Sequence, residues 1–506
     1  MAAPDDPDSL EPTPGLSPLP PARATRLWQR RSVWLVAVAV LLASLVVPRL
    51  HFRKSARPHH HPAARVANVD VSRARDTQAE TTVVVDPRSP RLLIAAANDW
   101  TLGVNSWVSK DAGGSWEADE AQMIAGLGCA DADPALAIDQ RGRAYLAVLG
   151  RTECTKSAPE RVFVARRLNV ATPWIPVTRP VAVAPERFKD DKPALAVDLG
   201  RNSMHRNRIY AAWARSWEDE EGIPSGAIVI THSDDGARTW SRLSSVSPAT
   251  QLAFSANIAI APNGEIYVAW DDPGNRGIWI DRSRDGVHFG ADHLVAAYLP
   301  VGEECDVPGA AIPAQPHRCV GPNPTLTIDP NAPMQVQVTY GNTDDADDSQ
   351  SVFLVAFDKT LRHVIIGRPA AQAGVRITPP EPKGSQADQF WPASAFDTAT
   401  KRLWVCFYDT TGDRSRRGAS YSCMVARDRG RTWLGPVRVA GVASDETQTG
   451  ARTFEYGDYE GLAVSGGQAH PMWTDSRRLE GEREEVYTAA LSEADVARAI
   501  KTPQHP

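Results

Sequence analysis

Residues 133–149 read DPALAIDQRGRAYLAVL, and residues 257–270 read NIAIAPNGEIYVAW. Each stretch holds a short apolar run, a polar turn and a second apolar run that contains an aromatic residue. Such runs, separated by turns of Asp, Asn and Gly, predict two antiparallel strands joined by a tight turn. Five related stretches are TTVVVDPRSPRLLIAAANDW (81–100), KPALAVDLGRNSMHRNRIYAAWAR (192–215), NPTLTIDPNAPMQVQVTY (323–340), WPASAFDTATKRLWVCFYD (391–409) and YEGLAVSGGQAHPMWTD (459–475).

A strand unit repeated along the chain is typical of solenoids, propellers and arrays. Short strands, Gly, Pro and Asp turns and the scarcity of helical patterns favour the propeller. We therefore predict an all-β fold over residues 64–492, a β-propeller of four-stranded blades with seven blades, or six as the alternative. The last unit lacks a fourth strand after EEVYTAALS (484–492), and ARVANVDVSR (64–73) is expected to supply it. Residues 493–506 are expected to form a short tail.

The N-terminal region has three predicted parts. Residues 1–31 are rich in Pro, Ala and Asp and are expected to be disordered. Residues 32–48 contain the apolar run Val33–Val47 and are expected to form a transmembrane or signal-anchor helix, followed by a linker over 49–63. This predicts a single-pass membrane protein whose propeller is extracytoplasmic, either periplasmic or extracellular. A cleaved signal peptide, the alternative, would export the same domain.

The six cysteines fall into three local pairs that predict disulfides and hence an oxidising compartment. The alternative is that all are separate buried thiols. The expected pairs are Cys129 with Cys154, Cys305 with Cys319, and Cys406 with Cys423. If the second pair forms, the Pro-rich segment 301–321 becomes a rigid loop that either borders a pocket or protects a sheet edge.

Charge and histidine spacing limit the partners. A net charge of −6 gives no broad basic field, so nucleic acid is not expected. The histidines show no metal-ligand spacing, and no metal or other cofactor is expected. Adjacent carboxylates at Asp190 and Asp191 leave a Ca²⁺-stabilised scaffold as a weaker alternative.

A hairpin motif recurs after the third strand of several units. It reads SKDAGGSW (109–116), SDDGARTW (233–240), ARDRGRTW (426–433) and, in a shorter form, SRDGVHF (283–289). This hairpin resembles the Asp-box, Ser-x-Asp-x-Gly-x-Thr-Trp, of sialidase-like β-propellers. Its Asp is expected to accept backbone N–H groups across the turn, and its Trp to bury a ring at the blade end. The structural residues are then Asp111, Trp116, Asp235, Trp240, Asp285, Asp428 and Trp433.

The resemblance also implies a site. Sialidases use a Tyr nucleophile paired with a Glu, an Asp acid/base and three Arg that bind the sugar carboxylate. The best match is RTFEYGDYEGLAV (452–464), which offers Tyr456 as nucleophile. The candidate catalytic residues are Tyr456, Glu455, Asp458, Glu460 and Asp191, and the candidate substrate-binding residues are Arg452, Arg477, Arg215 and Asp388.

The match to sialidases is incomplete. The sequence has no Arg-Ile-Pro motif on its first strands, which argues against a strict sialidase assignment. Tyr456 and Tyr459 as packing residues at the channel mouth are the alternative to a catalytic role. The sequence therefore predicts an exported, membrane-anchored, sialidase-like propeller that acts as an exo-glycosidase on glycans. The alternative is a non-catalytic cell-surface propeller that binds a glycan or a glycoprotein, and the oligomeric state is left open.

Overall fold

A computed structural model describes residues 60–74, 76–119, 130–151, 158–175, 177, 179–218, 222–248, 253–297, 309–344, 349–368, 374–382, 385–448, 454–477 and 484–502. They belong to one unit that extends from residue 58 to residue 506. The predicted tail 1–31 and helix 32–48 lie outside the described residues, as do Cys129, Cys154, Cys305 and Arg452. Within the described ranges, no helix is both long and apolar enough to cross a membrane.

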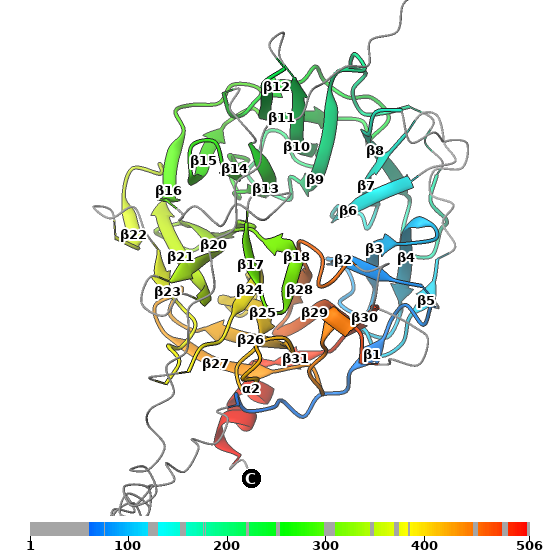
Figure 1. The fold of residues 1–506 in the computed structure, drawn as a ribbon. Coiled ribbons are helices and arrows are strands. Elements are labelled where there is room, and N and C mark those ends of the chain that lie inside the picture. The colour runs from blue at the N-terminus through cyan, green and yellow to red at the C-terminus, as the bar shows by residue number, and fades with distance from the viewer. Residues whose placement is uncertain are drawn as a thin grey trace, which may run out of the picture. The chain divides into compact units, whose positions relative to one another are not determined.

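Seven antiparallel sheets form a ring (Figure 1), which confirms the seven-bladed propeller. Each innermost strand contacts the innermost strands of both neighbouring blades, so the ring is closed. The innermost strands are β2 (Gln78–Val85), β6 (Ala130–Ile138), β9 (Lys189–Val197), β13 (Phe254–Ile260), β19 (Thr325–Asp329), β24 (Gln389–Asp397) and β28 (Gly461–Ser465). The second strands are β3 (Leu93–Asp99), β7 (Ala144–Gly150), β10 (Ile209–Glu218), β14 (Ile266–Asp272), β20 (Gln335–Asp344), β25 (Arg402–Asp409) and β29 (Gln468–Asp475).

The outer strands complete the blades. The third strands are β4 (Gly103–Ser109), β8 (Arg161–Arg167), β11 (Pro224–Ser233), β15 (Gly277–Ser283), β21 (Ser349–Asp358), β26 (Ser420–Ala426) and β30 (Glu485–Thr488). The outermost strands are β5 (Glu117–Ala118), β12 (Ser244–Ser245), β16 (His293–Ala297), β22 (Val364–Ile366) with β23 (Val375–Arg376), β27 (Trp433–Arg438) and β1 (Val69–Asp70). In the second blade, an isolated bridge between Arg166 and Ile175 takes the place of a fourth strand.

The last blade is completed by the N-terminal strand, as the sequence predicts. Strand β1 pairs with β30, with Val69 opposite Thr488 and Asp70 opposite Tyr487. Strand β31 (Leu491–Ser492) pairs with β29, and helix α2 (Glu493–Lys501) follows it. The ring is thus closed by strands from both ends of the propeller.

Seven hydrophobic clusters lie between neighbouring blades and form the core. One contains Leu93 and Trp107 of the first blade together with Met472 and Val486 of the last, so the closing interface is packed like the others. The other six join each successive pair of blades. Successive side chains along a strand point to opposite faces of the sheet, and each face packs against a neighbouring blade. This explains why the strands are apolar on both faces.

The hairpins between third and fourth strands are closed by their aspartates. Asp235 accepts the N–H groups of Arg238 and Thr239, both at 2.9 Å, and the Thr239 hydroxyl at 2.7 Å. Equivalent bonds join Asp111 to Ser115, Asp285 to His288 and Asp428 to Thr432. The tryptophans differ from one another, because Trp116 is buried whereas Trp240 and Trp433 are half-buried.

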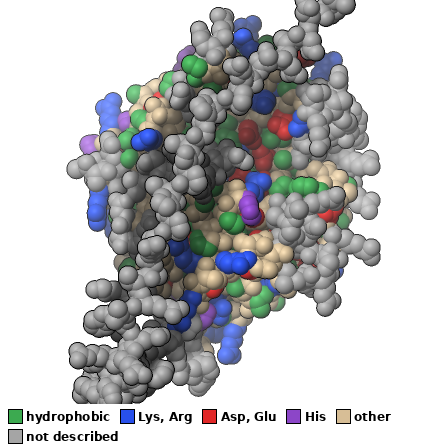
Figure 2. Space-filling view, in the orientation of Figure 1, with side chains coloured by type: hydrophobic (Ala, Val, Ile, Leu, Met, Phe, Trp, Pro, Cys, Tyr) green, Lys and Arg blue, Asp and Glu red, His purple; other side chains and the backbone are tan. Residues whose placement is uncertain are grey.

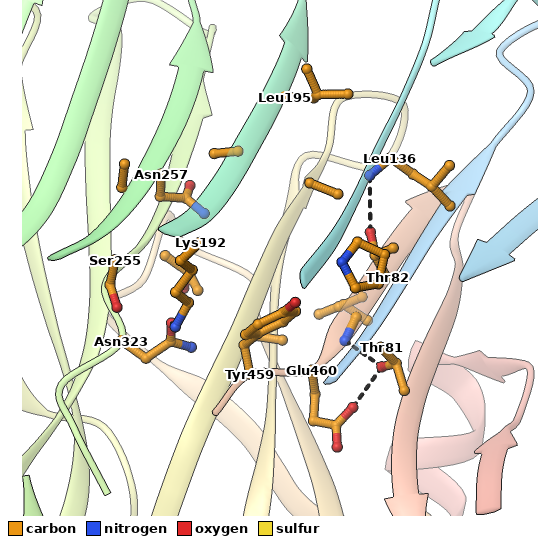
Figure 3. A pocket seen from close by; sticks show the side chains of 18 of the residues that line it. Thr81, Thr82, Leu136, Lys192, Leu195, Ser255, Asn257, Asn323, Tyr459 and Glu460 are labelled. Carbon is orange, nitrogen blue, oxygen red and sulfur yellow. Dashed lines mark hydrogen bonds between the residues drawn. The ribbon is translucent and has the colours of Figure 1, made fainter. Parts of the chain in front are cut away.

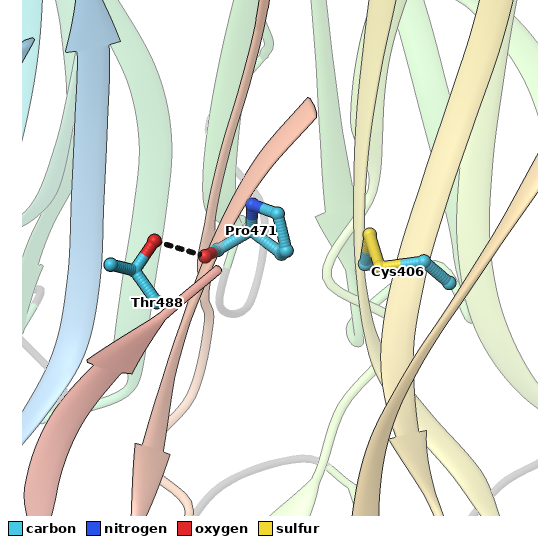
Figure 4. Close-up of a disulfide and its surroundings, with 4 residues drawn as sticks. Cys406, Pro471 and Thr488 are labelled. Atoms are coloured by element: carbon cyan, nitrogen blue, oxygen red, sulfur yellow. Dashed lines mark hydrogen bonds between the residues drawn. A yellow bond between two sulfur atoms is a disulfide. The ribbon is translucent and has the colours of Figure 1, made fainter. Parts of the chain in front are cut away.

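The disulfide between Cys406 and Cys423 links β25 to β26 (Figure 4), as predicted. Cys319 is also disulfide-bonded. The pairing of Cys129 with Cys154 stays a prediction because both residues lie outside the described ranges.

Closure by β1 can be tested by Val71→Pro. Val71 is buried, and its N–H donates to the carbonyl of Val486 at 2.8 Å. Proline removes that donor, so we expect the free energy of unfolding to fall by about 3 kcal/mol or more, measured by urea denaturation. Val71→Ala, which keeps the N–H, should lose less. Equal stability of wild type and Val71→Pro would contradict the closing role.

Candidate functional site at the channel mouth

The innermost strands all begin on the same face of the ring, where one residue per blade surrounds the mouth of the central channel. We call these residues the mouth ring, and they are Glu80, Asp133, Lys192, Ser255, Asn323, Trp391 and Tyr459. The first six have φ between 40° and 59°, in the left-handed region that side chains other than glycine rarely adopt.

A β-bulge accounts for this backbone conformation. The register between inner and second strand shifts around Glu80, Asp133, Lys192, Ser255 and Trp391. A bulge turns the side chain out of the regular alternation and costs free energy, so it persists only where the surrounding structure imposes it. The same distortion in blade after blade indicates that the fold holds the mouth ring in place.

Below the mouth ring lies a cavity of about 220 Å³, lined by all seven innermost strands. Figure 3 shows Lys192 and Asn323 on one side of this cavity, with Tyr459 and Glu460 facing them. A smaller cavity of about 30 Å³ lies beside Phe254, Asp271, Trp391 and Asp458. Figure 2 shows acidic side chains gathered in the hollow at the middle of this face.

Three carboxyl groups form a hydrogen-bonded chain at the mouth. Asp133 bonds through its side chain to Glu80 and to Asp191. A hydrogen bond between two carboxyl groups requires a proton on one of them. Burial, reinforced by the charge of Asp191, raises the pKa of Asp133 to about 7, and burial raises the pKa of Asp191 to about 6. Burial and the charge of Asp458 raise the pKa of Glu80 well above its usual range.

Arg318 bridges two acids across the mouth. Its Nη2 lies 2.9 Å from Glu80 Oε1 and 2.8 Å from Asp458 Oδ2. Arg318 belongs to a hairpin formed by β17 (Ala310–Ile312) and β18 (Gln315–Val320). Part of the Pro-rich segment therefore borders the site, which is one of the two roles expected for it.

Tyr459 faces Asp133 and Lys192. Its hydroxyl lies 3.4 Å from Asp133 Oδ1, and the Lys192 ammonium lies 4.8 Å from the centre of its ring. Lys192 also donates to Asn323 Oδ1 at 3.1 Å. The mouth therefore combines an aromatic face, a cation and an amide with the carboxyl chain.

Glu460 lines the cavity, but its carboxylate points to the wall between blades. It accepts hydrogen bonds from the Thr81 hydroxyl at 2.5 Å, from the Thr474 N–H at 2.9 Å and from the Tyr408 hydroxyl. Burial raises the pKa of Glu460 to about 7. These bonds link the first, sixth and seventh blades.

Tyr456 lies in the core between the last two blades. Its hydroxyl donates to the Ser444 carbonyl at 2.6 Å and accepts the Ala419 N–H at 3.2 Å, and the side chain is fully buried. Burial, with the charge of Glu446, raises the pKa of Tyr456 well above its usual range. This placement favours the packing role for Tyr456, whereas Tyr459 faces the mouth.

The remaining candidates are held in other contacts. Glu455 accepts the His317 ring nitrogen at 2.8 Å and the Arg318 N–H at 3.1 Å, so it anchors the β17–β18 hairpin. Arg215 forms an ion pair with Asp190 at 2.6 Å, and Arg416 forms one with Asp388 at 2.6 Å. Arg477 forms an ion pair with Asp475. Of the nine predicted catalytic and substrate-binding residues, the structure brings Asp191, Asp458 and Glu460 to the mouth. Across the described ranges, no group of three or more His, Cys, Asp or Glu side chains could hold a metal ion.

The motif comparison with sialidases missed Glu80, Asp133, Lys192 and Arg318. The mouth-ring residues can be recognised from their fixed position in the sequence repeat. Each mouth-ring residue stands six positions before the end of the first apolar run, as Glu80 does before Asp86 and Asp133 before Asp139. Arg318 lies outside the repeat, so no such count could find it.

The packing role of Tyr456 can be tested by Tyr456→Phe. Loss of the hydroxyl removes one of two hydrogen bonds to the Ser444 carbonyl, which still accepts the Ala419 N–H at 2.9 Å. The free energy of unfolding should therefore fall by about 0.5–1.5 kcal/mol. Tyr459→Phe is the matched control for stability alone, because its hydroxyl makes only a long bond at the mouth, 3.4 Å from Asp133. Urea denaturation and turnover of aryl glycosides are measured on both. Lost turnover with unchanged stability in Tyr456→Phe would show that Tyr456 is catalytic.

No protein-family model and no curated protein matches the chain. Among solved structures, a protein of unknown function from Dyadobacter fermentans is 13% identical, with 84% of this chain and 97% of that chain covered and a TM-score of 0.45. An α-L-arabinanase of Penicillium chrysogenum is 13% identical, over 71% and 92% of the two chains, with a TM-score of 0.43. A sialidase of Trypanosoma rangeli is 9% identical, over 87% and 59%, with a TM-score of 0.43.

Proposed function

We propose that this propeller hydrolyses glycosidic bonds at the mouth of its central channel, with the Asp133 carboxyl as the proton donor. The observation that carries the proposal is the carboxyl chain of Glu80, Asp133 and Asp191. A proton shared along this chain near neutral pH is what general acid catalysis of glycoside cleavage needs. The cavity below it has room for part of a sugar chain.

The second catalytic group is proposed to be the Asp458 carboxylate. Glycoside hydrolysis requires a protonated carboxyl and an ionised one in different environments. Asp458 forms an ion pair with Arg318, whereas Asp133 lies between two other acids. Asp133 would protonate the leaving oxygen, and Asp458 would either attack the anomeric carbon or activate a water molecule. Tyr459, 3.4 Å from Asp133, would keep that carboxyl in place.

The proposed substrate is a glycan whose bound sugar carries no negative charge. Two cations, Lys192 and Arg318, face several carboxyl groups at the mouth, and Arg318 is already bonded to Glu80 and Asp458. An anionic sugar would meet unfavourable charge there and, among the described residues, no unoccupied arginine clamp. The aromatic face of Tyr459, with the amide of Asn323, suits a neutral sugar that has both apolar and hydroxyl surfaces.

A non-catalytic glycan-binding propeller is the second candidate. It is favoured by Arg318, because the Glu80–Arg318–Asp458 bridge occupies two of the mouth carboxylates. In that case the same sugars would bind at the mouth without being cleaved.

Asp133→Asn tests the proposed reaction. Kinetics are measured with a panel of neutral aryl glycosides and sialosides, with product release followed over pH. Wild type should cleave a neutral substrate with kcat/KM falling as pH rises through about 7, because Asp133 must be protonated to donate. The Asn variant should lose about 10²-fold or more in kcat/KM and lose this dependence.

The exposed Glu117→Gln serves as control, since Glu117 lies on the opposite face of the ring and forms an exposed ion pair with Lys110. Binding of neutral sugars without turnover by wild type would favour the second candidate. Preference for sialosides, or an Asn variant as active as wild type, would contradict the proposed chemistry.

We also propose that the propeller is exported and held at a membrane by residues 32–48. The Cys406–Cys423 disulfide supports an oxidising compartment. Protease added outside intact cells or spheroplasts should then cleave the propeller while a cytoplasmic marker stays intact. Protection of the propeller until the membrane is lysed would place it in the cytoplasm and contradict export.

A further inference from the structure

The face of the ring opposite the mouth carries many exposed arginines. The innermost strands run away from the mouth, so the turns that follow them lie on the opposite face, as do the hairpins between third and fourth strands. In the second to fourth blades these turns and hairpins, with the end of β8, hold Arg141, Arg166, Arg201, Arg206, Arg238 and Arg284, which we call the basic turn surface. All are exposed except Arg166, which is half-buried.

The basic turn surface is continuous across three blades. Gln140 donates to the Leu199 carbonyl at 2.6 Å, which joins the turns that hold Arg141 and Arg201. Arg166 donates to the carbonyl of Gly236 at 3.1 Å, beside Arg238. Arg208 donates to the Asp285 carbonyl at 3.1 Å, next to Arg284. Side chains from the separate turns therefore present their charge side by side.

The acids of this region neutralise these arginines only in part. Among the described residues, Arg284 is the one arginine of the six with an ion pair, at 3.8 Å from Glu265, whose carboxylate also binds Arg282 at 2.7 Å. The Asp234 carboxylate forms a two-bond ion pair with Arg208, at 2.8 and 3.0 Å. Asp235 and Asp285 accept N–H groups within their own turns. Burial, with a smaller contribution from the nearby charge of Arg238, lowers the pKa of Arg166. The surface is thus basic although the chain has a net charge of −6.

We infer that the basic turn surface binds an anionic polysaccharide, through guanidinium contacts to its sulfate or carboxylate groups. All six cations are arginines, whose planar fork matches such groups with two parallel hydrogen bonds. A row of these cations across three blades suits a polymer with regularly spaced charges. The site is separate from the channel mouth and does not depend on the reaction proposed there.

An anionic membrane is the main competing partner, and the path of the chain disfavours it. The first described residues lie on the sixth blade, where His61 Nε2 is 3.3 Å from Asp409 and Ala64 donates to the Arg438 carbonyl at 2.8 Å. Asp409 is the last residue of β25, and the second strand of every blade ends on the mouth side. Residues 60–64 therefore lie on the mouth side of the ring. The described chain therefore begins on the face opposite the basic turn surface.

The test measures binding of the full chain to heparin, a sulfated polysaccharide, by titration at several salt concentrations. Wild type should bind with an affinity that falls steeply between about 50 and about 200 mM salt. The triple variant Arg201→Glu, Arg238→Glu and Arg284→Glu should bind about tenfold more weakly or worse, with a shallower salt dependence. All three side chains are exposed, so the fold should be retained, and circular dichroism checks this.

Two matched variants exclude other basic regions. Arg187→Glu, Lys189→Glu and Arg276→Glu change three exposed cations on the mouth side, and Ala at Arg49, Arg53, Lys54 and Arg57 removes the charge of the predicted linker. Both should bind heparin like wild type. Any of three results would overturn the inference. The triple variant at Arg201, Arg238 and Arg284 could bind heparin as well as wild type, or binding could be lost only in the linker variant. Wild type could also bind only phosphatidylserine vesicles or duplex DNA.

Discussion

Each blade of this propeller has two apolar faces, and neither can be left in water. Each face is covered only by the next blade, so the core exists as seven clusters between blades and not as one central core. The first and last blades must therefore meet, and β1 hydrogen-bonds to β30 to secure that meeting. The channel, the mouth ring and the turns of the opposite face all follow from this closure.

Closure also explains the electrostatics of the mouth. Seven inner strands converge on one opening, so residues far apart in the sequence, such as Glu80 and Asp458, come within reach of one guanidinium. Burial, reinforced by the charge of neighbouring carboxyl groups crowded in this way, raises the pKa of Asp133 to about 7. The opposite face differs, because the turns of its second to fourth blades carry exposed arginines that local acids neutralise only in part.

Local patterns predicted the fold well because strand period, turn residues and repeat spacing all express one blade. The N-terminal closing strand followed from the missing fourth strand of the last unit, and the Cys406–Cys423 disulfide followed from the local pairing of the cysteines. The site was harder to predict. Tyr456 and Glu455 matched a motif in type and order, yet the chain turns at this point, so Tyr456 enters the core and Glu455 holds a hairpin. Arg318 reaches the mouth from an insertion, and no local pattern encodes that path.

The bulged mouth ring has one further consequence. Its backbone shape is set by blade packing, since residues as different as Glu80, Lys192, Ser255 and Trp391 adopt the same left-handed conformation. The backbone conformation at these positions therefore does not require one particular type of side chain. A lineage of such proteins could exchange one mouth residue at a time and reach new ligands without rebuilding the scaffold. The propeller would then act as an evolvable platform, with one interchangeable position in each blade.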